Sequence, residues 1–445
     1  MSINVIGAGL AGCEAAWQIA TRGVEVSLFE MKPRKFTPAH RNKNFAELVC
    51  SNSLKAERIS SAAGLLKAEM RILRSLLMEC ADICKVPAGG ALAVDREKFS
   101  ELVTQKIRSN PLIKIVETEV AKLPQEEVTI VATGPLTSEN LADEISKLCG
   151  GSLSFFDAAA PIITAESIDM NHAFFASRYN KGDDDAYINC PLNKDEYEAF
   201  YHELIYAQRA EIHDADVQNP KVYEGCMPVE IMAQRGLDTL RFGPMKPVGL
   251  RDPKTGNRPW AVLQLRKENT DGTLYNMVGF QTNLKFLEQK RVFSMIPALK
   301  NADFMRYGVM HRNTFINSPE VLNSDFSFRP NSKIFFAGQI TGVEGYMESA
   351  ASGIIAGINA VKRLKNEKPL VLPRETMIGA LSNYVNAGSQ NEFQPMGANF
   401  GILPSLDSHI KDKKARYEAL ANRSIKILKE SCDIYENNSL CFWRR

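Results

Sequence analysis

Short apolar runs alternate with glycine turns and helical patterns at the beginning of the chain. Residues 3–6 form an apolar run that predicts a strand, and the stretch GAGLAG follows it at once. Residues 13–22 then repeat small and apolar positions at helical spacing and end at Gly23, as a helix would. The next apolar run, residues 24–30, predicts a second strand that ends at Glu30. This order of strand, glycine turn, helix and strand is typical of a parallel sheet with helical crossovers.

The glycine turn has the spacing of a dinucleotide-binding fingerprint, GxGxxG, and an acidic residue ends the second strand. The first glycine would allow the tight turn, the second would let the backbone approach a pyrophosphate, and the third would let the helix pack on the strand. Glu30 would accept hydrogen bonds from the adenosine ribose and repel a 2′-phosphate, so we expect FAD or NAD rather than NADP. The expected binding residues are Gly7, Ala8, Gly9, Leu10, Ala11, Gly12 and Glu30.

Two later segments repeat the pattern of a strand followed by glycine. Residues 128–136 predict a strand that runs into Thr133 and Gly134. Residues 333–360 predict a strand that runs into Gly338, a turn that contains Gly342, and a helix of small residues. Both segments resemble the later motifs of FAD enzymes of the glutathione-reductase type. The resemblance favours FAD over NAD and implies one site built from both ends of the chain.

The predicted fold class is therefore α/β, with a Rossmann-like FAD-binding domain whose parallel sheet uses both chain ends and an inserted α+β domain. We expect the N-terminal part of the FAD-binding domain at residues 1–160, the inserted substrate domain at 161–290, and the remaining FAD-binding part with C-terminal helices at 291–445. The sequence contains no second strand, GxGxxG and helix unit, so NADPH or NADH would bind transiently without its own Rossmann domain.

Composition and charge narrow the class of protein further. There is no apolar run of about 18 residues and no signal-peptide pattern, so we expect a cytoplasmic protein without a membrane partner. The nine cysteines match neither a disulfide framework nor zinc spacing, so we expect reduced thiols and no metal site. Net charge is +2, which gives no global sign of nucleic-acid binding, but residues 241–266 and 411–429 are locally basic. Each basic segment is either a solvated face or an RNA contact.

Seven sequence blocks, spread in order from residue 36 to residue 353, stand out beyond the cofactor motifs. They are FTPAH (36–40), FAELVCSNSLKAE (45–57), GLLKAEM (64–70), VPAGGALAVDRE (86–97), FGPMKPVGL (242–250), YGVMHRNT (307–314) and GVEGYMESAASG (342–353). These blocks resemble the folate-dependent tRNA uracil-5-methyltransferase family, often called TrmFO. A weaker similarity, mainly in the FAD motifs, extends to the tRNA-modifying MnmG (GidA) flavoproteins.

The resemblance implies an enzyme that takes a methylene group from methylenetetrahydrofolate and reduces it with flavin electrons supplied by NADPH or NADH. The methyl group would go to carbon 5 of the T-loop uridine, in the T arm of tRNA. Carbon 5 of uracil is a poor nucleophile, but a thiolate that adds to carbon 6 turns the ring into an enolate, so this chemistry needs a cysteine. A base must then remove the proton from carbon 5. The implied partners are tRNA, folate and a pyridine nucleotide, with no obligatory protein partner.

Particular residues match the family's site. Cys226, in YEGCMPVE, matches its catalytic cysteine, and Cys50 matches its second active-site cysteine. We expect Cys226 to attack uracil and Cys50 to be an auxiliary thiol, although the two roles could be exchanged. His311 matches the histidine that the family places against the folate pterin, and Tyr346 is expected near the isoalloxazine. Two basic residues could contact RNA phosphate or the folate glutamate tail: Lys246 and Arg251.

Three other functions stay open on the sequence alone. The same chemistry could act on a ribosomal RNA uridine, since nothing in the sequence identifies the base context. A wobble-uridine modifier of the MnmG type would need a GTPase partner, for which we expect a long C-terminal helical extension that these 445 residues lack. An RNA-binding protein with a structural flavin would need neither the cysteines nor the folate-type histidine.

Overall fold

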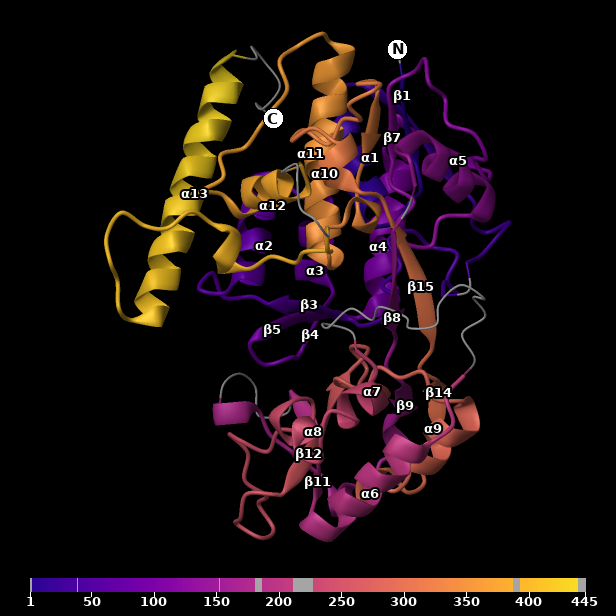
Figure 1. Cartoon of the computed structure of the whole chain (residues 1–445), viewed down its shortest axis with the longest axis vertical. Helices are drawn as coiled ribbons and strands as arrows, with labels where there is room; N and C mark the ends of the chain where they lie inside the picture. The colour runs from indigo at the N-terminus through magenta and orange to yellow at the C-terminus, as the bar shows by residue number, and fades with distance from the viewer. Residues whose placement is uncertain are drawn as a thin grey trace.

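The computed structural model of the chain describes residues 2–37, 39–151, 153–180, 186–210, 227–386 and 393–438. Figure 1 shows two parts that follow one another along the long axis of the molecule. The upper part contains the N-terminal and C-terminal segments of the chain, and the lower part is formed by its middle. The cofactor fold is thus built from both ends, around a separate middle part.

The upper part is organised around a five-stranded parallel sheet with the order β16-β7-β1-β2-β6. Most of the inner-strand residues are apolar and buried, as expected for a parallel sheet that is covered on both faces. The last strand in the sequence lies at one edge, beside β7, so the chain returns to its N-terminal sheet after the middle part. The strands are β1 (Ser2–Ile6), β2 (Glu25–Glu30), β6 (Ile113–Glu117), β7 (Thr129–Val131) and β16 (Ile334–Phe336).

Helices pack on this sheet and on one another. Helix α1 (Leu10–Ala20) packs closely against α11 (Tyr346–Leu364), because Gly353 and Gly357 of α11 face the backbone of α1. The remaining elements of the upper part are α2 (Ala62–Ile72), α3 (Leu76–Ile83), α4 (Arg96–Ser109), α5 (Glu139–Cys149), α10 (Ser318–Val321), α12 (Met377–Asn386), α13 (Lys413–Asn438), and a small sheet of β3 (Ser53–Ala56), β5 (Ala91–Val94) and β4 (Lys85–Val86).

The lower part contains a six-stranded sheet with the order β10-β11-β12-β13-β9-β14, in which all neighbouring strands are antiparallel. It has its own hydrophobic core. Its last strand ends at Arg306, so this sheet extends beyond residue 290, where we expected the inserted domain to end. The strands are β9 (Ile162–Thr164), β10 (Phe174–Phe175), β11 (Tyr187–Leu192), β12 (Ala261–Lys267), β13 (Leu274–Met277) and β14 (Phe304–Arg306), and the helices are α6 (Lys194–Tyr206), α7 (Val229–Ala233), α8 (Thr239–Phe242) and α9 (Phe286–Phe293).

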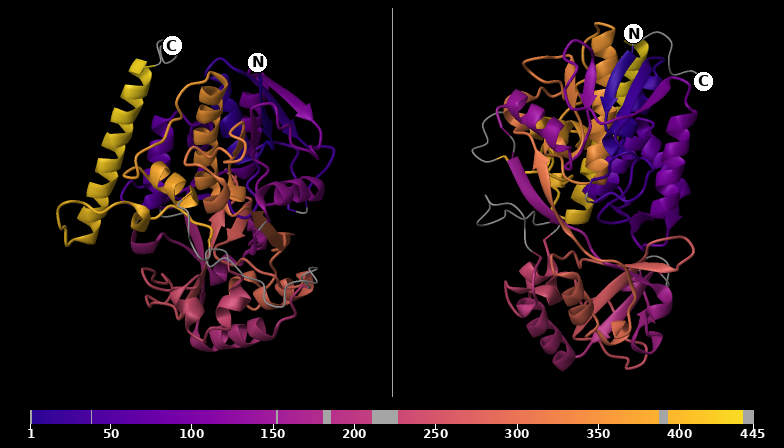
Figure 2. Two further views of the ribbon diagram at one scale, coloured as in Figure 1. Left: turned by 45° about the horizontal axis from the view of Figure 1, so that its top comes forward. Right: turned by 90° about the vertical axis from the view of Figure 1, so that its right-hand side faces the viewer.

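A two-stranded antiparallel ribbon joins the two parts. Strand β8 (Leu153–Ala158) leaves the upper part and strand β15 (Met310–Phe315) returns to it, and the two pair along their whole length. Both views in Figure 2 show the chain passing between the parts through this narrow region. Within the described residues, no helix is long and apolar enough to cross a membrane.

Candidate active site

The glycine turn between β1 and α1 adopts the geometry that its sequence predicts. Gly7 has a φ of +98°, in the region that favours glycine. A Cβ on Gly12 would overlap the carbonyl oxygen of Gly7, so glycine is needed there for the helix to pack on the turn. A Cβ on Gly9 would meet no atom of the described residues within 4 Å, because this position faces open space. The N-terminus of α1 has no side-chain cap, so its backbone N–H groups are available to an anion.

Glu30 links the end of β2 to this turn. Its carboxylate accepts hydrogen bonds from the backbone N–H of Ala8 at 2.9 Å and from that of Lys32 at 2.9 Å. The side chain is mostly buried, and it lines the same cavity as the glycine turn. A carboxylate held in this way keeps lone pairs that can accept from ribose hydroxyls. The turn and Glu30 together fit the adenosine and pyrophosphate part of FAD.

One cavity gathers most of the residues expected at the site, from segments far apart in the sequence. It lies at the carboxyl ends of the parallel strands, where open α/β sheets bind their ligands. The expected residues that line it are Gly7, Ala8, Gly9, Leu10, Ala11, Glu30, Cys50, Thr133, Gly134, Gly338 and Tyr346.

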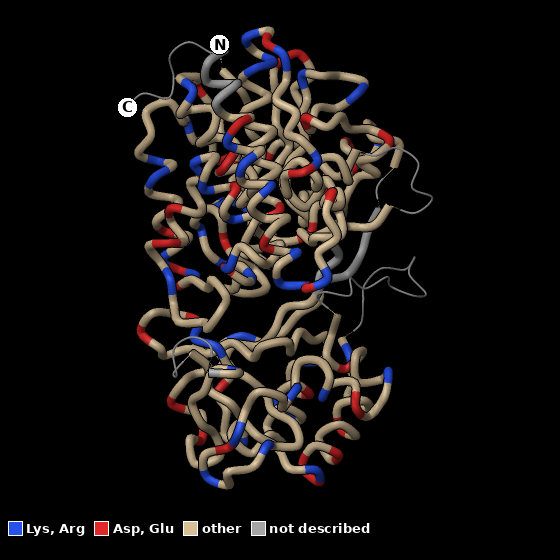
Figure 3. Tube along the Cα trace, turned by 90° about the vertical axis from the view of Figure 1, so that its left-hand side faces the viewer, with Lys and Arg blue, Asp and Glu red and all other residues tan. Residues whose placement is uncertain are grey.

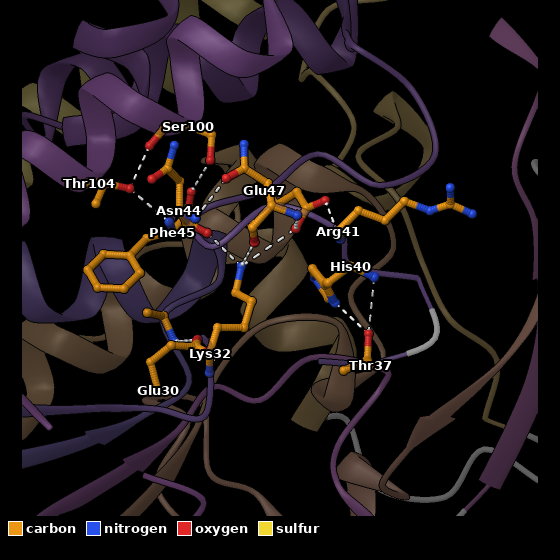
Figure 4. A network of polar contacts seen from close by, with 12 residues as sticks. Glu30, Lys32, Thr37, His40, Arg41, Asn44, Phe45, Glu47, Ser100 and Thr104 are labelled. Carbon is orange, nitrogen blue, oxygen red and sulfur yellow. Dashed lines mark hydrogen bonds and ion pairs between the residues drawn. The ribbon is translucent and has the colours of Figure 1, made fainter. Parts of the chain in front are cut away.

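The loop from β2 to Cys50 is held by a polar network, which Figure 4 shows. The Lys32 ammonium donates to the carbonyl oxygens of Asn42 and Asn44 and lies 3.6 Å from Glu47. Helix α4 fixes the same loop at Phe45, whose N–H donates to Thr104 at 2.8 Å and whose carbonyl accepts from Ser100 at 2.6 Å. A loop tied at these points gives Cys50 a fixed position at the cavity.

Cys50 contacts the side chain of Tyr346, the first residue of α11. The tyrosine oxygen accepts hydrogen bonds from the backbone N–H of Cys50 at 2.7 Å and of Ser51 at 3.2 Å. The same oxygen lies 3.0 Å from the Cys50 sulfur. Burial, and secondarily the charge of Cys50, raises the pKa of Tyr346 well above its usual value. The phenol therefore keeps its proton at neutral pH and can donate a hydrogen bond to the sulfur.

His40 also lines the cavity, and sequence reasoning missed it as a site residue although it lies in the FTPAH block. Its Nδ1 lies 2.6 Å from the Thr37 hydroxyl, which also accepts from the His40 backbone N–H. Figure 4 shows the two side chains facing each other. Burial lowers the pKa of His40 below its usual value, so a neutral imidazole lines the cavity at pH 7.

The other residues expected at the site do not line this cavity or lie outside the residues that the structure describes. Gly12 and Gly342 serve packing and turn geometry, the latter with a φ of +79°. Lys246 and Arg251 are exposed in the segment between α8 and β12. His311 lies on the connecting ribbon, in register with Asp157, and Cys226 lies outside the described residues.

One member of the basic segment 241–266 does not lie at the surface. Arg266 is only 5% exposed and donates to the side chains of Ser51 and Asn52 across the interface between the parts. The expectation that it contributes to a basic patch is wrong, because strand β12 turns this side chain inward. Figure 3 shows how the lysine and arginine positions are distributed along the trace of both parts.

Comparison with known proteins identifies the family of this chain. The family model described as glucose inhibited division protein A matches residues 2–368. The "Methylenetetrahydrofolate--tRNA-(uracil-5-)-methyltransferase TrmFO" of Acetivibrio thermocellus is 61% identical over 434 residues, which are 97% of this chain and 99% of that protein. The protein of the same name from Desulfitobacterium hafniense is 57% identical, over 96% of this chain and 98% of that protein. The chain belongs to the TrmFO family.

A solved structure shows that the wider GidA fold is shared. The structure of Aquifex aeolicus GidA in its form II crystal has a TM-score of 0.68 and is 16% identical, with 97% of this chain and 73% of that chain covered. At this identity the similarity concerns the fold alone. It confirms the fold class predicted from the sequence, a Rossmann-type α/β fold shared by this TrmFO family member and GidA.

Proposed function

We propose that the chain is an FAD-dependent enzyme that methylates carbon 5 of the T-loop uridine in tRNA, with methylenetetrahydrofolate as the one-carbon donor and NADPH or NADH as the reductant. The support is the juxtaposition of Cys50 and Tyr346 with the dinucleotide turn in one cavity. The relatives that share 55 to 61% of the sequence carry the name of this activity. Since tRNA is the substrate, we place the enzyme in the cytoplasm.

The chain's own residues would bind FAD at the glycine turn. The N–H groups at the start of α1 would face the pyrophosphate, and Glu30 would accept from the ribose hydroxyls. FAD, when bound, supplies the electrons that reduce the transferred one-carbon group. Gly338, which precedes the turn to α11, donates its N–H to Ser352, so the returning strand and helix hold one side of the cavity in place.

Cysteine chemistry would activate the uracil. We propose that the Cys226 thiolate adds to carbon 6 of the base and leaves after a base has removed the proton from carbon 5. Cys50 would be the auxiliary thiol, since it lies at the cavity with the Tyr346 hydroxyl at 3.0 Å. His311 would contact the folate, and Lys246 and Arg251 would contact RNA phosphate or the folate tail. The uridine must leave its T-loop contacts to react, at a cost of a few kcal/mol.

A methyl-transfer assay tests the proposal. The purified yellow protein is incubated with an unmodified tRNA transcript, NADPH and methylenetetrahydrofolate labelled in its methylene group, and the nucleosides are then mapped. We expect label in 5-methyluridine at the T loop. A parallel incubation uses ribosomal RNA in place of the tRNA transcript. Label in ribosomal RNA but not in tRNA, or label at the wobble uridine, would replace the proposal with one of the alternatives, and an FAD-loaded protein that transfers no label to either RNA would contradict it.

Cysteine variants then assign the thiols. Cys226→Ser is expected to keep FAD, lose at least about 100-fold in methylation rate, and fail to trap RNA that contains 5-fluorouracil. Cys149→Ser is the matched control, because this buried cysteine ends α5 and is not among the described residues that line the cavity. Full activity of the Cys226 variant together with loss of trapping by Cys50→Ser would give the nucleophile role to Cys50.

A further inference from the structure

Charged side chains from both parts of the molecule gather beside the residues that flank Cys50. Arg96 is the first residue of α4, and Arg306 is the last residue of β14. Arg266 lies near the end of β12, and Glu268 directly follows that strand. The side chains of Arg96 and Glu268 are 12% and 5% exposed, and their ion pair measures 2.5 Å from Arg96 Nε to Glu268 Oε1. The cluster therefore exists only where the cofactor part and the middle part meet.

The arginines hold the residues on either side of Cys50. Arg96 Nη1 donates to the carbonyl oxygen of Val49 at 3.1 Å. Arg266 donates to the Ser51 hydroxyl at 2.9 Å and to the Asn52 side-chain oxygen at 2.9 Å. One guanidinium group thus binds the backbone before Cys50, and another, from the other part of the molecule, binds the side chains of the two residues after it.

The cluster has more positive than negative charge. Three arginines face one carboxylate, Glu268, and burying unpaired charge is costly. Burial lowers the pKa of Arg306, and the neighbouring Arg96 lowers it further. Among the described residues, the buried Arg306 Nε has no hydrogen-bond acceptor. A nearby anion would offset this excess, and Arg96 interacts electrostatically with both Cys50 and Tyr346.

Hydrogen-bond geometry favours the sulfur over the tyrosine oxygen as the acceptor in their contact. The Tyr346 oxygen already accepts from two backbone N–H groups, those of Cys50 and Ser51. Its two lone pairs are then occupied, and its own proton is directed to the remaining neighbour, the Cys50 sulfur at 3.0 Å. This arrangement favours the sulfur as the acceptor, a role in which a thiolate is stronger than a thiol.

We propose that Arg96 and Arg306, with the Tyr346 hydroxyl, form a cationic site between the two parts that holds the Cys50 sulfur as a thiolate. The thiol loses its proton to solvent, and the resulting negative charge faces the guanidinium groups and accepts from the phenol. Arg96 is a positioning residue, since it acts through Cys50. An arginine at the first position of a helix is locally unfavourable because the helix dipole is positive there, and contact with an anion would offset that cost.

The alkylation rate of Cys50 tests this site without folate or tRNA, so its outcome is independent of the proposed methyl transfer. The FAD-loaded protein is treated with iodoacetamide over a range of pH, and the Cys50 peptide is quantified by mass spectrometry. Alkylation requires the thiolate, which displaces iodide to form a thioether. Among the described residues, Tyr346 from α11 contacts the sulfur and Arg96 from α4 interacts with it electrostatically. Glu268 pairs with Arg96, Arg266 binds the neighbouring Ser51, and Arg306 interacts electrostatically with Arg96 and Tyr346.

Two substitutions should act in opposite directions. Arg96→Gln removes a positive charge and is expected to slow alkylation at pH 7 by about 10-fold, with the midpoint of the pH profile moved up by about one unit. Glu268→Gln removes the opposing charge and should move the midpoint down. Arg96→Lys should restore most of the wild-type rate, because it keeps the charge.

Arg71→Gln is the matched control. Arg71 lies on α2, outside this cluster, and pairs with Asp82 and Glu57. Removing its charge should therefore leave the pH profile of Cys50 alkylation unchanged. FAD content and the melting temperature identify variants that fail to fold. The proposal is overturned if Glu268→Gln and Arg96→Gln move the midpoint in the same direction, or if neither moves it.

Discussion

At the scale of the residue, one tyrosine hydroxyl binds the backbone of the loop that carries Cys50. Tyr346 begins α11 and reaches Cys50 and Ser51, which are distant in the sequence. Two backbone N–H groups donate to its oxygen, and the adjacent Cys50 sulfur is the proposed acceptor of its own O–H. Removing this oxygen would therefore affect both the stability of the loop and the state of the thiol.

Tyr346→Phe is expected to lower the free energy of unfolding by about 1 to 2 kcal/mol, because two buried N–H groups lose their acceptor. It should also slow Cys50 alkylation at neutral pH while FAD remains bound. Chemical denaturation and the alkylation assay measure the two effects. Tyr384→Phe, which removes a hydroxyl that donates to Gln394 away from the cavity, is the control. Equal stability and equal alkylation of the two variants would contradict the role given to Tyr346.

Sequence reasoning succeeded for residues whose role depends on local backbone geometry. The positions of Gly7, Gly9 and Glu30 follow from spacing alone, because a strand, a turn and a helix fix them relative to one another. It missed Arg96, which lies in the VPAGGALAVDRE block with no sequence neighbour that reveals its partner. Only tertiary packing brings it to Val49 and Glu268. Arg266 was placed at the surface for the same reason, since net charge in a segment does not show which side chains turn inward.

At the scale of the element, a buried carboxylate joins three helices. Glu69 of α2 accepts from the backbone N–H groups of Met377 and Ile378, at the start of α12, and from the Ser424 hydroxyl of α13. Burial raises the pKa of Glu69 to about 7, although the three hydrogen bonds lower it. A carboxyl group that holds its proton to higher pH when folded binds more protons in the folded state. Its contribution to stability is complete below pH 4.5, the unfolded value, and is lost as pH rises through 7.

Glu69→Gln removes this titration. The stability of the wild-type protein should fall relative to that of the variant by about 2 kcal/mol between about pH 5 and pH 8. Chemical denaturation at several pH values measures the difference. The comparison is of slopes, so a constant offset caused by the lost acceptor does not affect it. Parallel curves for the two proteins would show that Glu69 does not titrate in this range.

The packing of α1 on α11 gives a second prediction at this scale. A Cβ on Gly353 would overlap the carbonyl oxygen of Ala11, in the first turn of α1. Gly353→Ala is therefore expected to destabilise the protein by about 1 to 3 kcal/mol and to weaken FAD retention, because it displaces the turn that lines the cavity. Gly90→Ala is the control, since a Cβ there meets no described atom within 4 Å. Denaturation and flavin absorbance of the purified variants measure both effects, and an unaffected Gly353 variant would show that the helices can separate at little cost.

At the scale of the whole molecule, the insertion places a second folded part beside the cavity. The FAD-type motifs near both chain ends indicated a two-part α/β protein with an inserted middle, and the sheet order agrees with a cofactor fold built from both chain ends. The exact end of the middle part was harder to predict, because β14 is a short strand that joins the six-stranded sheet by pairing with β9. Such a strand has little pattern of its own, and its place is decided by a partner far away in the sequence.

Two basic surfaces on the different parts are suited to a large anionic substrate. One is the exposed group Lys246, Arg251, Lys254 and Arg258, and the other is Lys411, Lys413, Lys414 and Arg416 at the start of α13. Phosphate contacts there would offset part of the cost of exposing the uridine. They carry no base information, so recognition would depend mainly on the shape of the RNA.

Removing charge from either surface should weaken tRNA binding in a salt-dependent way. Each double variant, Lys254→Ala/Arg258→Ala and Lys413→Ala/Arg416→Ala, is expected to raise the Kd several-fold and to reduce the slope of log K against log salt by about 0.7 to 0.9 per lost phosphate contact. Binding titrations between about 50 and 200 mM salt measure the slope. Lys114→Ala/Lys122→Ala, two exposed lysines outside both surfaces, is the matched control. Slopes that equal the control for both variants would exclude these surfaces as the RNA contact, and a change in only one would assign the contact to that part of the molecule.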